Sequence, residues 1–143
     1  MSLPNSETSS NVGRNLILAP ADYAKRLWDW TPFNECFPRG IRIGDVDGFV
    51  EIGGCFLILD GKPLGGEVKK GQLMAFTRLV ALSERIAYVV LYGDPPMGVK
   101  GMKIIRKRYG QVDGVSYVAD LAFALRFVRR WARAASQFRN EHP

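Results

Sequence analysis

Two aspartates and a lysine, on either side of a Gly-Gly pair, are the residues of this chain best suited to phosphate chemistry. Gly53-Gly54 separates two segments of alternating apolar residues, which predicts a hairpin with a two-residue turn. In that register Asp47 lies directly opposite Asp60, and like charges about 5 Å apart destabilise a strand pair. Because Mg²⁺ binds through one or two carboxylates, we expect the two aspartates to share a divalent cation. Lys62, on the same face, would orient a water or stabilise charge on a phosphate.

The same register assigns the rest of the hairpin to two faces. Asp45 faces Lys62, and Glu51 lies near the turn on the face of the aspartates. The other face is expected to form the core through Val46, Val50, Ile52, Cys55, Leu57 and Leu59. A simpler alternative is a solvated hairpin face with a surface ion pair at Lys62 worth under about 1 kcal/mol. In that case Asp45 only starts the strand and Glu51 is hydrated near the turn.

The chain around the hairpin predicts helices and strands in alternation. Helices are expected at residues 21–30, 70–85 and 117–136, and strands at 41–52, 55–62, 86–92 and 100–107. Thr31-Pro32 is expected to end the first helix. A strand, helix and strand of this length predict a right-handed crossover that makes strands 55–62 and 86–92 parallel. The fold class is therefore α/β, with the order α-β-β-α-β followed by a further strand and helix.

The hairpin and its flanks resemble the core of the PD-(D/E)XK nuclease superfamily. The similarity rests on Asp45-Val46-Asp47-Gly48-Phe49-Val50-Glu51, Phe56-Leu57-Ile58-Leu59, Asp60-Gly61-Lys62 and Gly71-Gln72. It covers about residues 41–92 and points to small phage-type and Holliday-junction-resolvase-like members. The resemblance implies a restriction-endonuclease-like core, in which helices flank a mixed central sheet.

The resemblance also implies roles for individual residues. Asp47 matches the first metal-binding acid, Asp60 the second and Lys62 the catalytic lysine. Gln72 resembles a glutamine that some branches use near the site, although alone it is typical of a solvated or capping residue, and Glu51 would act as an auxiliary ligand or base. The implied cofactor is Mg²⁺ or Mn²⁺. Many members add an acid from the first helix, for which the candidates are Asp22, Asp29 and Glu35.

The excess of basic residues is compatible with a polyanionic partner, although solvated surfaces often carry the same excess. The chain has 20 Lys and Arg against 14 Asp and Glu, a formal net charge of +6. Four arginines recur at helical spacing on the last predicted helix and form one stripe, Arg126, Arg129, Arg130 and Arg133. We expect the stripe to contact DNA phosphates, with Lys69 and Lys70 flanking the predicted metal site. An ordinary solvated helix face would carry the same stripe.

Length and composition bound the class of protein. A chain of 143 residues with 47% apolar residues fits one domain, predicted at 16–143 after a disordered polar leader at 1–15. Two cysteines without a CxxC pair and a single histidine exclude a disulfide framework and a zinc site. No apolar run is long enough to cross a bilayer, and we expect a cytoplasmic protein.

The sequence and the resemblance together predict a Mg²⁺-dependent nuclease that hydrolyses phosphodiester bonds of DNA, with RNA as the alternative nucleic acid. By analogy with the resembled family it would act as a homodimer. The alternative is a non-catalytic nucleic-acid-binding or protein-binding module on the same fold. For the enzyme, Asp60→Asn and Lys62→Ala are expected to abolish cleavage and to leave the fold intact.

Overall fold

The computed structural model describes residues 28–143, so the predicted leader at 1–15 lies outside the described residues. The chain divides into two compact units, Met1–Ile43 and Gly44–Pro143. In the first unit the described part contains the short helix α2 (Thr31–Asn34) and the 3₁₀ turn η2 (Pro38–Gly40).

The predicted first helix, 21–30, lies mostly outside the described residues, and its described part, 28–30, is not helical. Thr31 and Pro32, which were expected to follow the end of a helix, open the short helix α2. Proline is tolerated in a first helical turn because its missing N–H would have no intrahelical partner at that position.

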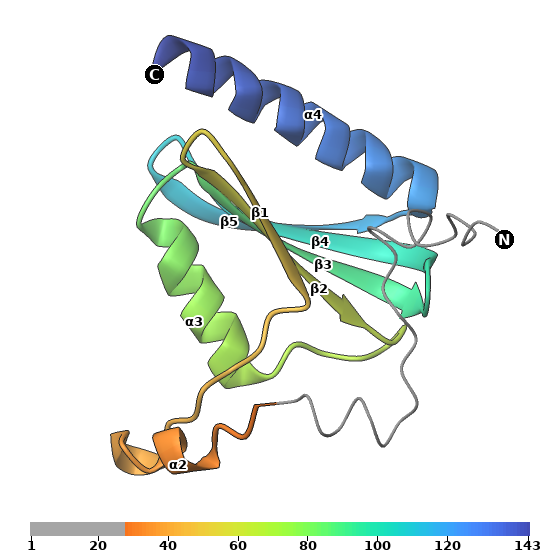
Figure 1. The fold of residues 1–143 in the computed structure, drawn as a ribbon. Coiled ribbons are helices and arrows are strands. Elements are labelled where there is room, and N and C mark those ends of the chain that lie inside the picture. The colour runs from red at the N-terminus through yellow and green to blue at the C-terminus, as the bar shows by residue number, and fades with distance from the viewer. Residues whose placement is uncertain (1–27) are drawn as a thin grey trace, which may run out of the picture. The chain divides into compact units, whose positions relative to one another are not determined.

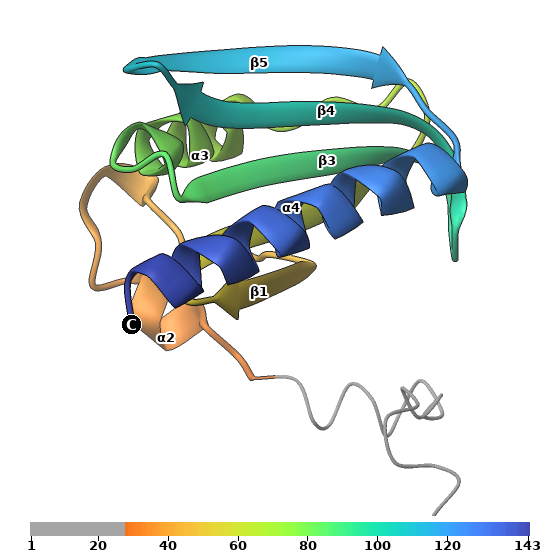
Figure 2. The same ribbon diagram turned by 90° about the horizontal axis from the view of Figure 1, so that it is seen from above.

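The second unit is built on a five-stranded mixed sheet. Its strands are β1 (Gly48–Ile52), β2 (Cys55–Lys62), β3 (Ile86–Asp94), β4 (Gly98–Arg108) and β5 (Gln111–Val118), and they lie in the order β1-β2-β3-β4-β5. Only β2 and β3 are parallel, as predicted, and α3 (Lys70–Ala81) connects them. The last helix is α4 (Leu121–Glu141). Figures 1 and 2 show α3 and α4 on opposite faces of the sheet.

The β1–β2 hairpin has the predicted turn and register. Gly53 and Gly54 have φ values of 56° and 86°, so both adopt the left-handed conformation that a tight two-residue hairpin turn requires. Ile52 pairs with Cys55, the partner expected from that turn. Because the turn alone sets this register, the local sequence was sufficient to predict it.

The first strand is shorter than the predicted 41–52 and begins at Gly48. Directly before it, the Asp47 N–H donates to the Asp60 carboxylate, so the backbone leaves the strand ladder at that point. Val46 and Val50 were expected in the core, and this is wrong: they are 44% and 38% exposed. They lie before and on β1, which is an edge strand.

Both faces of β2 are covered, which corrects the prediction of one apolar and one polar face. Leu57 packs with Val89 in the core under α4. Ile58 packs with Tyr88 in a second core under α3. A strand beside a parallel neighbour is normally covered by helices on both faces. Asp60 shares the α3 face with Ile58, and it is therefore enclosed rather than solvated.

The C-terminal elements differ most from prediction. Strand β5 was not expected, and the helix predicted from residue 117 begins at Leu121. Asp120 caps it, since its Oδ1 accepts the N–H of Phe123 at 2.8 Å. The predicted strand 100–107 is β4, slightly extended, and α3 ends at Ala81 rather than at residue 85.

The described residues thus form an α/β fold with a five-stranded mixed sheet and three helices. None of the helices in residues 28–143 is long and apolar enough to cross a membrane.

Candidate functional site

Asp47 and Asp60 lie side by side, just before β1 begins and close to the end of β2. The Asp47 N–H donates to Asp60 Oδ1 at 3.1 Å, and the Gly61 N–H donates to Asp47 Oδ2 at 2.8 Å. Each carboxylate is therefore held by backbone next to the other. Two N–H donors offset part of the repulsion between the like charges. The predicted pairing brings these two side chains together as expected.

Asp60 is the deeply buried member of the pair. Its residue is only 4% exposed, and its Oδ2 accepts two further hydrogen bonds, both at 2.6 Å, from Gln72 Nε2 and from the Tyr88 hydroxyl. Gln72 stands in the first turn of α3 and Tyr88 on β3, next to β2. Three donors, from the segment before β1, from α3 and from β3, satisfy this carboxylate, which is what a buried charge requires.

Tyr88 is a site residue that the sequence analysis missed. Burial, then its hydrogen bond to Asp60 and the charge of that carboxylate, raise the pKa of the Tyr88 phenol well above its usual value. The group therefore remains a neutral donor. Phe76 of α3 stacks on the Tyr88 ring with centroids 4.1 Å apart, which fixes the direction of the hydroxyl. Only the parallel register, which pairs Ile58 with Tyr88, brings this ring next to Asp60.

Lys62 ends β2, two residues after Asp60, and is half-buried. It forms no ion pair with any residue of the described part, where the single salt bridge joins Lys100 to Asp94. Asp47, Asp60 and Lys62 all line one cavity of about 520 Å³ at the ends of β2 and β3. The three residues that sequence reasoning selected therefore share one space.

Two other predicted acids lie apart from this pair. Glu51 is exposed on β1 opposite Phe56, next to the hairpin turn. Four residues of extended chain, roughly 13 Å, separate it from Asp47. Asp45 is exposed before β1, where the ladder that would have paired it with Lys62 has not yet begun.

The candidate helical acids belong to the first unit or lie outside the described residues. Asp29 accepts a hydrogen bond from the Thr31 N–H at 3.0 Å, and hydrogen bonds from Thr31 lower the pKa of this exposed carboxyl. Glu35 is exposed and directly follows α2 as its C-terminal cap. Asp22 precedes residue 28, where the described part of the chain begins.

The predicted phosphate-binding residues fall on two sides of the sheet. Lys69 and Lys70 are exposed at the start of α3, near Gln72 in the same helix. The four arginines of the stripe, Arg126, Arg129, Arg130 and Arg133, are on α4, which covers the opposite face. The lysines, rather than the arginines, lie on the side of the carboxylates.

The pair offers oxygen ligands of the kind that Mg²⁺ takes. Asp60 Oδ2 accepts two hydrogen bonds, whereas Asp60 Oδ1 and Asp47 Oδ2 accept one each, so these two oxygens and Asp47 Oδ1 keep lone pairs for a metal. Residues 28–143 contain no group of three or more Asp, Glu, His or Cys side chains arranged around one ion position. Two carboxylates nevertheless fit Mg²⁺, which keeps waters and substrate phosphates as its other ligands.

Comparison with family models, curated proteins and solved structures found no match for this chain.

Proposed function

We propose that the second unit is a Mg²⁺- or Mn²⁺-dependent nuclease that hydrolyses phosphodiester bonds of DNA. One observation carries the proposal: two carboxylates, Asp60 bonded to the Asp47 N–H and Asp47 bonded to the Gly61 N–H, share a cavity of about 520 Å³ with a lysine that has no ion-pair partner in the described residues. Carboxylates for a hard cation and a cation for phosphate are the components of metal-assisted hydrolysis. The resemblance to the PD-(D/E)XK superfamily supports the same roles.

In this proposal each residue has a defined task. Asp47 and Asp60 would hold the metal, which when bound would polarise the scissile phosphate and lower the pKa of a water. Gln72 and Tyr88 are positioning residues, because they donate to Asp60 Oδ2 and leave Oδ1 toward Asp47. Lys62 would orient the attacking water and stabilise charge that develops on the phosphate. Lys69 and Lys70 would contact the DNA backbone on this side.

The order of elements supports a restriction-endonuclease-like core. A hairpin, a helical crossover and a parallel strand follow one another from β1 to β3, with the acid-x-Lys triplet on the inner strand of the hairpin. The two additional strands extend the sheet beyond β3, on the side away from the carboxylates.

A second candidate function is a nucleic-acid-binding module on the same fold that does not cleave. It is favoured by the position of Glu51, which lies too far along β1 to ligate with the pair, and by the absence of any third acid beside the pair in residues 28–143. Metal-dependent cleavage separates the two functions.

The test is incubation of the purified protein with linear, single-stranded and branched DNA, with and without Mg²⁺ or Mn²⁺. We expect cleavage only with metal, and Lys62→Ala should lower the rate by about 100-fold or more. Lys103→Ala is the matched control, since it removes the same charge from a half-buried position on β4 outside the cavity. Metal-independent cleavage, or equal rates for the two lysine variants, would overturn the proposed mechanism.

A further inference from the structure

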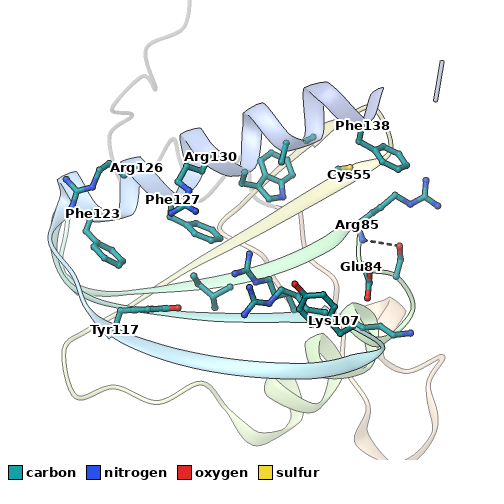
Figure 3. Close-up of a pocket in the computed structure, with 18 residues that line it drawn as sticks. Cys55, Glu84, Arg85, Lys107, Tyr117, Phe123, Arg126, Phe127, Arg130 and Phe138 are labelled. Atoms are coloured by element: carbon teal, nitrogen blue, oxygen red, sulfur yellow. Dashed lines mark hydrogen bonds between the residues drawn. The ribbon is translucent and has the colours of Figure 1, made fainter. Parts of the chain in front are cut away.

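An open groove of about 990 Å³ lies on the α4 side of the sheet, away from the carboxylate pair. Helix α4 packs against β1 and β4, and the space beside it reaches Tyr117 of β5. In Figure 3, Phe123 and Phe127 extend from α4 into this space, Arg126 and Arg130 lie beside them on the helix, and Tyr117 lies across the space. Cys55, the first residue of β2, lines the groove, whereas Lys62, the last, lines the cavity. The two sites are thus separated by roughly 23 Å of strand.

The groove is strongly basic. Six cationic residues line it: Arg85, Arg106, Lys107, Arg108, Arg126 and Arg130. Glu84 is the only acidic residue of the lining, and its carboxylate already accepts the N–H of Gly110 at 3.1 Å. None of the six cations forms a salt bridge within residues 28–143. Unbalanced positive charge of this density favours an anionic partner.

Arg106 shows how closely these cations are grouped. It is half-buried on β4, and burial, followed by the charge of Arg108, lowers the pKa of its guanidinium, although Asp113 and Tyr117 act in the opposite direction. Arg130 of α4 also lowers this pKa. Strand β4 and helix α4 therefore both place positively charged side chains in the groove. An anion in the groove would relieve their repulsion.

Aromatic rings alternate with the cations in the lining. Each of the three guanidinium–ring contacts in the described residues occurs here: Arg85 over Phe138 at 5.3 Å, Arg106 over Phe127 at 5.6 Å and Arg126 over Phe123 at 5.8 Å. Each contact favours a position of the guanidinium group over a ring. An acidic peptide would use the charges but would have little use for the rings.

Tyr109, at the β4–β5 turn, is the most exposed of the lining aromatics. Its side chain belongs to a residue that is 95% exposed, and its φ of 52° lies in the left-handed region that Gly, Asn and Asp normally occupy in such a turn. Neither packing nor turn geometry therefore accounts for a tyrosine at this position. A ring held at the edge of a basic groove is suited to stack on a planar ligand.

We infer that this groove binds single-stranded nucleic acid, with phosphates on the arginines and a base stacked on an exposed ring of the lining, Tyr109. Unpaired bases present the faces that such rings need, whereas duplex bases are stacked on each other. This inference adds to the proposed nuclease function a site that would hold a single-stranded part of the substrate. The groove lies apart from the carboxylates, so binding there does not require hydrolysis.

The arginine stripe of α4 provides a matched comparison. Arg126 and Arg130 line the groove, whereas Arg129 and Arg133, on the same helix, do not.

Binding of a labelled oligothymidine of about 20 nucleotides, long enough for one such site, is measured by anisotropy in EDTA. Arg126→Gln with Arg130→Gln should weaken binding and reduce the slope of log K against log salt by about 1.4, at about 0.7 for each phosphate that is no longer neutralised. Arg129→Gln with Arg133→Gln should leave the slope near that of the wild type. Equally weakened binding in the two double variants would overturn the inference in favour of a general charge effect.

Tyr109→Asn tests the aromatic part. Asparagine tolerates the left-handed turn, so the variant removes the ring and keeps the hairpin. We expect affinity to fall about tenfold with an unchanged salt slope, because a stacked base carries no charge. Unchanged affinity, equal affinity for duplex, or displacement by polyglutamate as effective as by unlabelled oligothymidine would each contradict the inference. Because EDTA prevents metal-dependent cleavage, a protein that binds but never cleaves would refute only the proposed nuclease.

Discussion

Asp60 combines a structural and a proposed chemical role in one side chain. A buried carboxylate is tolerated only when its oxygens are satisfied, and here the donors come from Asp47, Gln72 and Tyr88. Those donors also orient the carboxylate. Its substitution therefore changes stability as well as chemistry, which modifies the expectation that Asp60→Asn leaves the fold intact.

Asp60→Asn should lower the free energy of unfolding by about 1–3 kcal/mol, because an amide N–H₂ would face at least one of the groups that now donate to the carboxylate. Urea denaturation measures this decrease. Asp47→Asn is the control, since Asp47 is exposed and accepts a single hydrogen bond from the Gly61 N–H, so its destabilisation should be smaller. Equal destabilisation would show that the buried donors contribute nothing to stability.

The pH dependence of stability should report on Tyr88. The pKa of Tyr88 is raised in the folded protein, whereas in the unfolded protein the phenol ionises at about pH 10. Below that pH both states keep the proton and Tyr88 makes no pH-dependent contribution. Above it the unfolded state loses protons first, so stability falls as the pH rises. The free energy of unfolding of Tyr88→Phe, measured by urea denaturation at a series of alkaline pH values, should fall less steeply. A slope equal to that of the wild type would contradict this assignment.

At the scale of helices and strands, the sequence-based predictions were correct where the geometry of a short turn determines the strand pairing. Gly53-Gly54 specified the first hairpin, its register and the meeting of Asp47 with Asp60. The corresponding turn at Tyr109-Gly110 was missed, since tyrosine rarely occupies a left-handed turn position, and β5 was missed with it.

Tertiary arrangement explains the other differences. Which residue of β3 lies beside Asp60 depends on how α3 docks, and no local pattern specifies that register. The same dependence made the α3 face of β2 look polar from the sequence, although the helix buries it. The way that α4 lies on the sheet likewise determines which arginines of the stripe line the groove and which do not.

Gly53, in the turn between β1 and β2, lies directly against α4. A Cβ at this position would lie 2.3 Å from Arg139 Cβ, whereas a Cβ at Gly110 would meet no atom within 4 Å. Both glycines have positive φ, so alanine costs about 1–2 kcal/mol of backbone strain at either position. Gly53→Ala should be less stable than Gly110→Ala by a further 1–3 kcal/mol or so, from the displaced helix. Thermal or urea unfolding of the two proteins checks this difference, and equal stability would mean that α4 adjusts freely.

On the scale of the whole molecule, the carboxylate pair, the cavity and the basic groove all belong to Gly44–Pro143. We expect a protein that begins at Gly44 to keep a cooperative thermal transition by circular dichroism, because both cores consist of residues of this unit. It should also bind oligothymidine with the affinity of the full chain. Loss of the transition would show that the first unit is needed for folding. Loss of DNA cleavage alone would show that cleavage requires the first unit.

The connectivity of the sheet has a kinetic consequence. Short turns join β1 to β2, β3 to β4 and β4 to β5, so these pairings close small loops. The parallel pairing of β2 with β3 instead closes a long connection that contains α3, and it brings Tyr88 to Asp60 across 28 residues of chain. Pairings between distant segments are the slow steps of folding. The two hairpin systems should therefore form early, and the hydrogen bonds around Asp60 should be completed last, when the two halves of the sheet join.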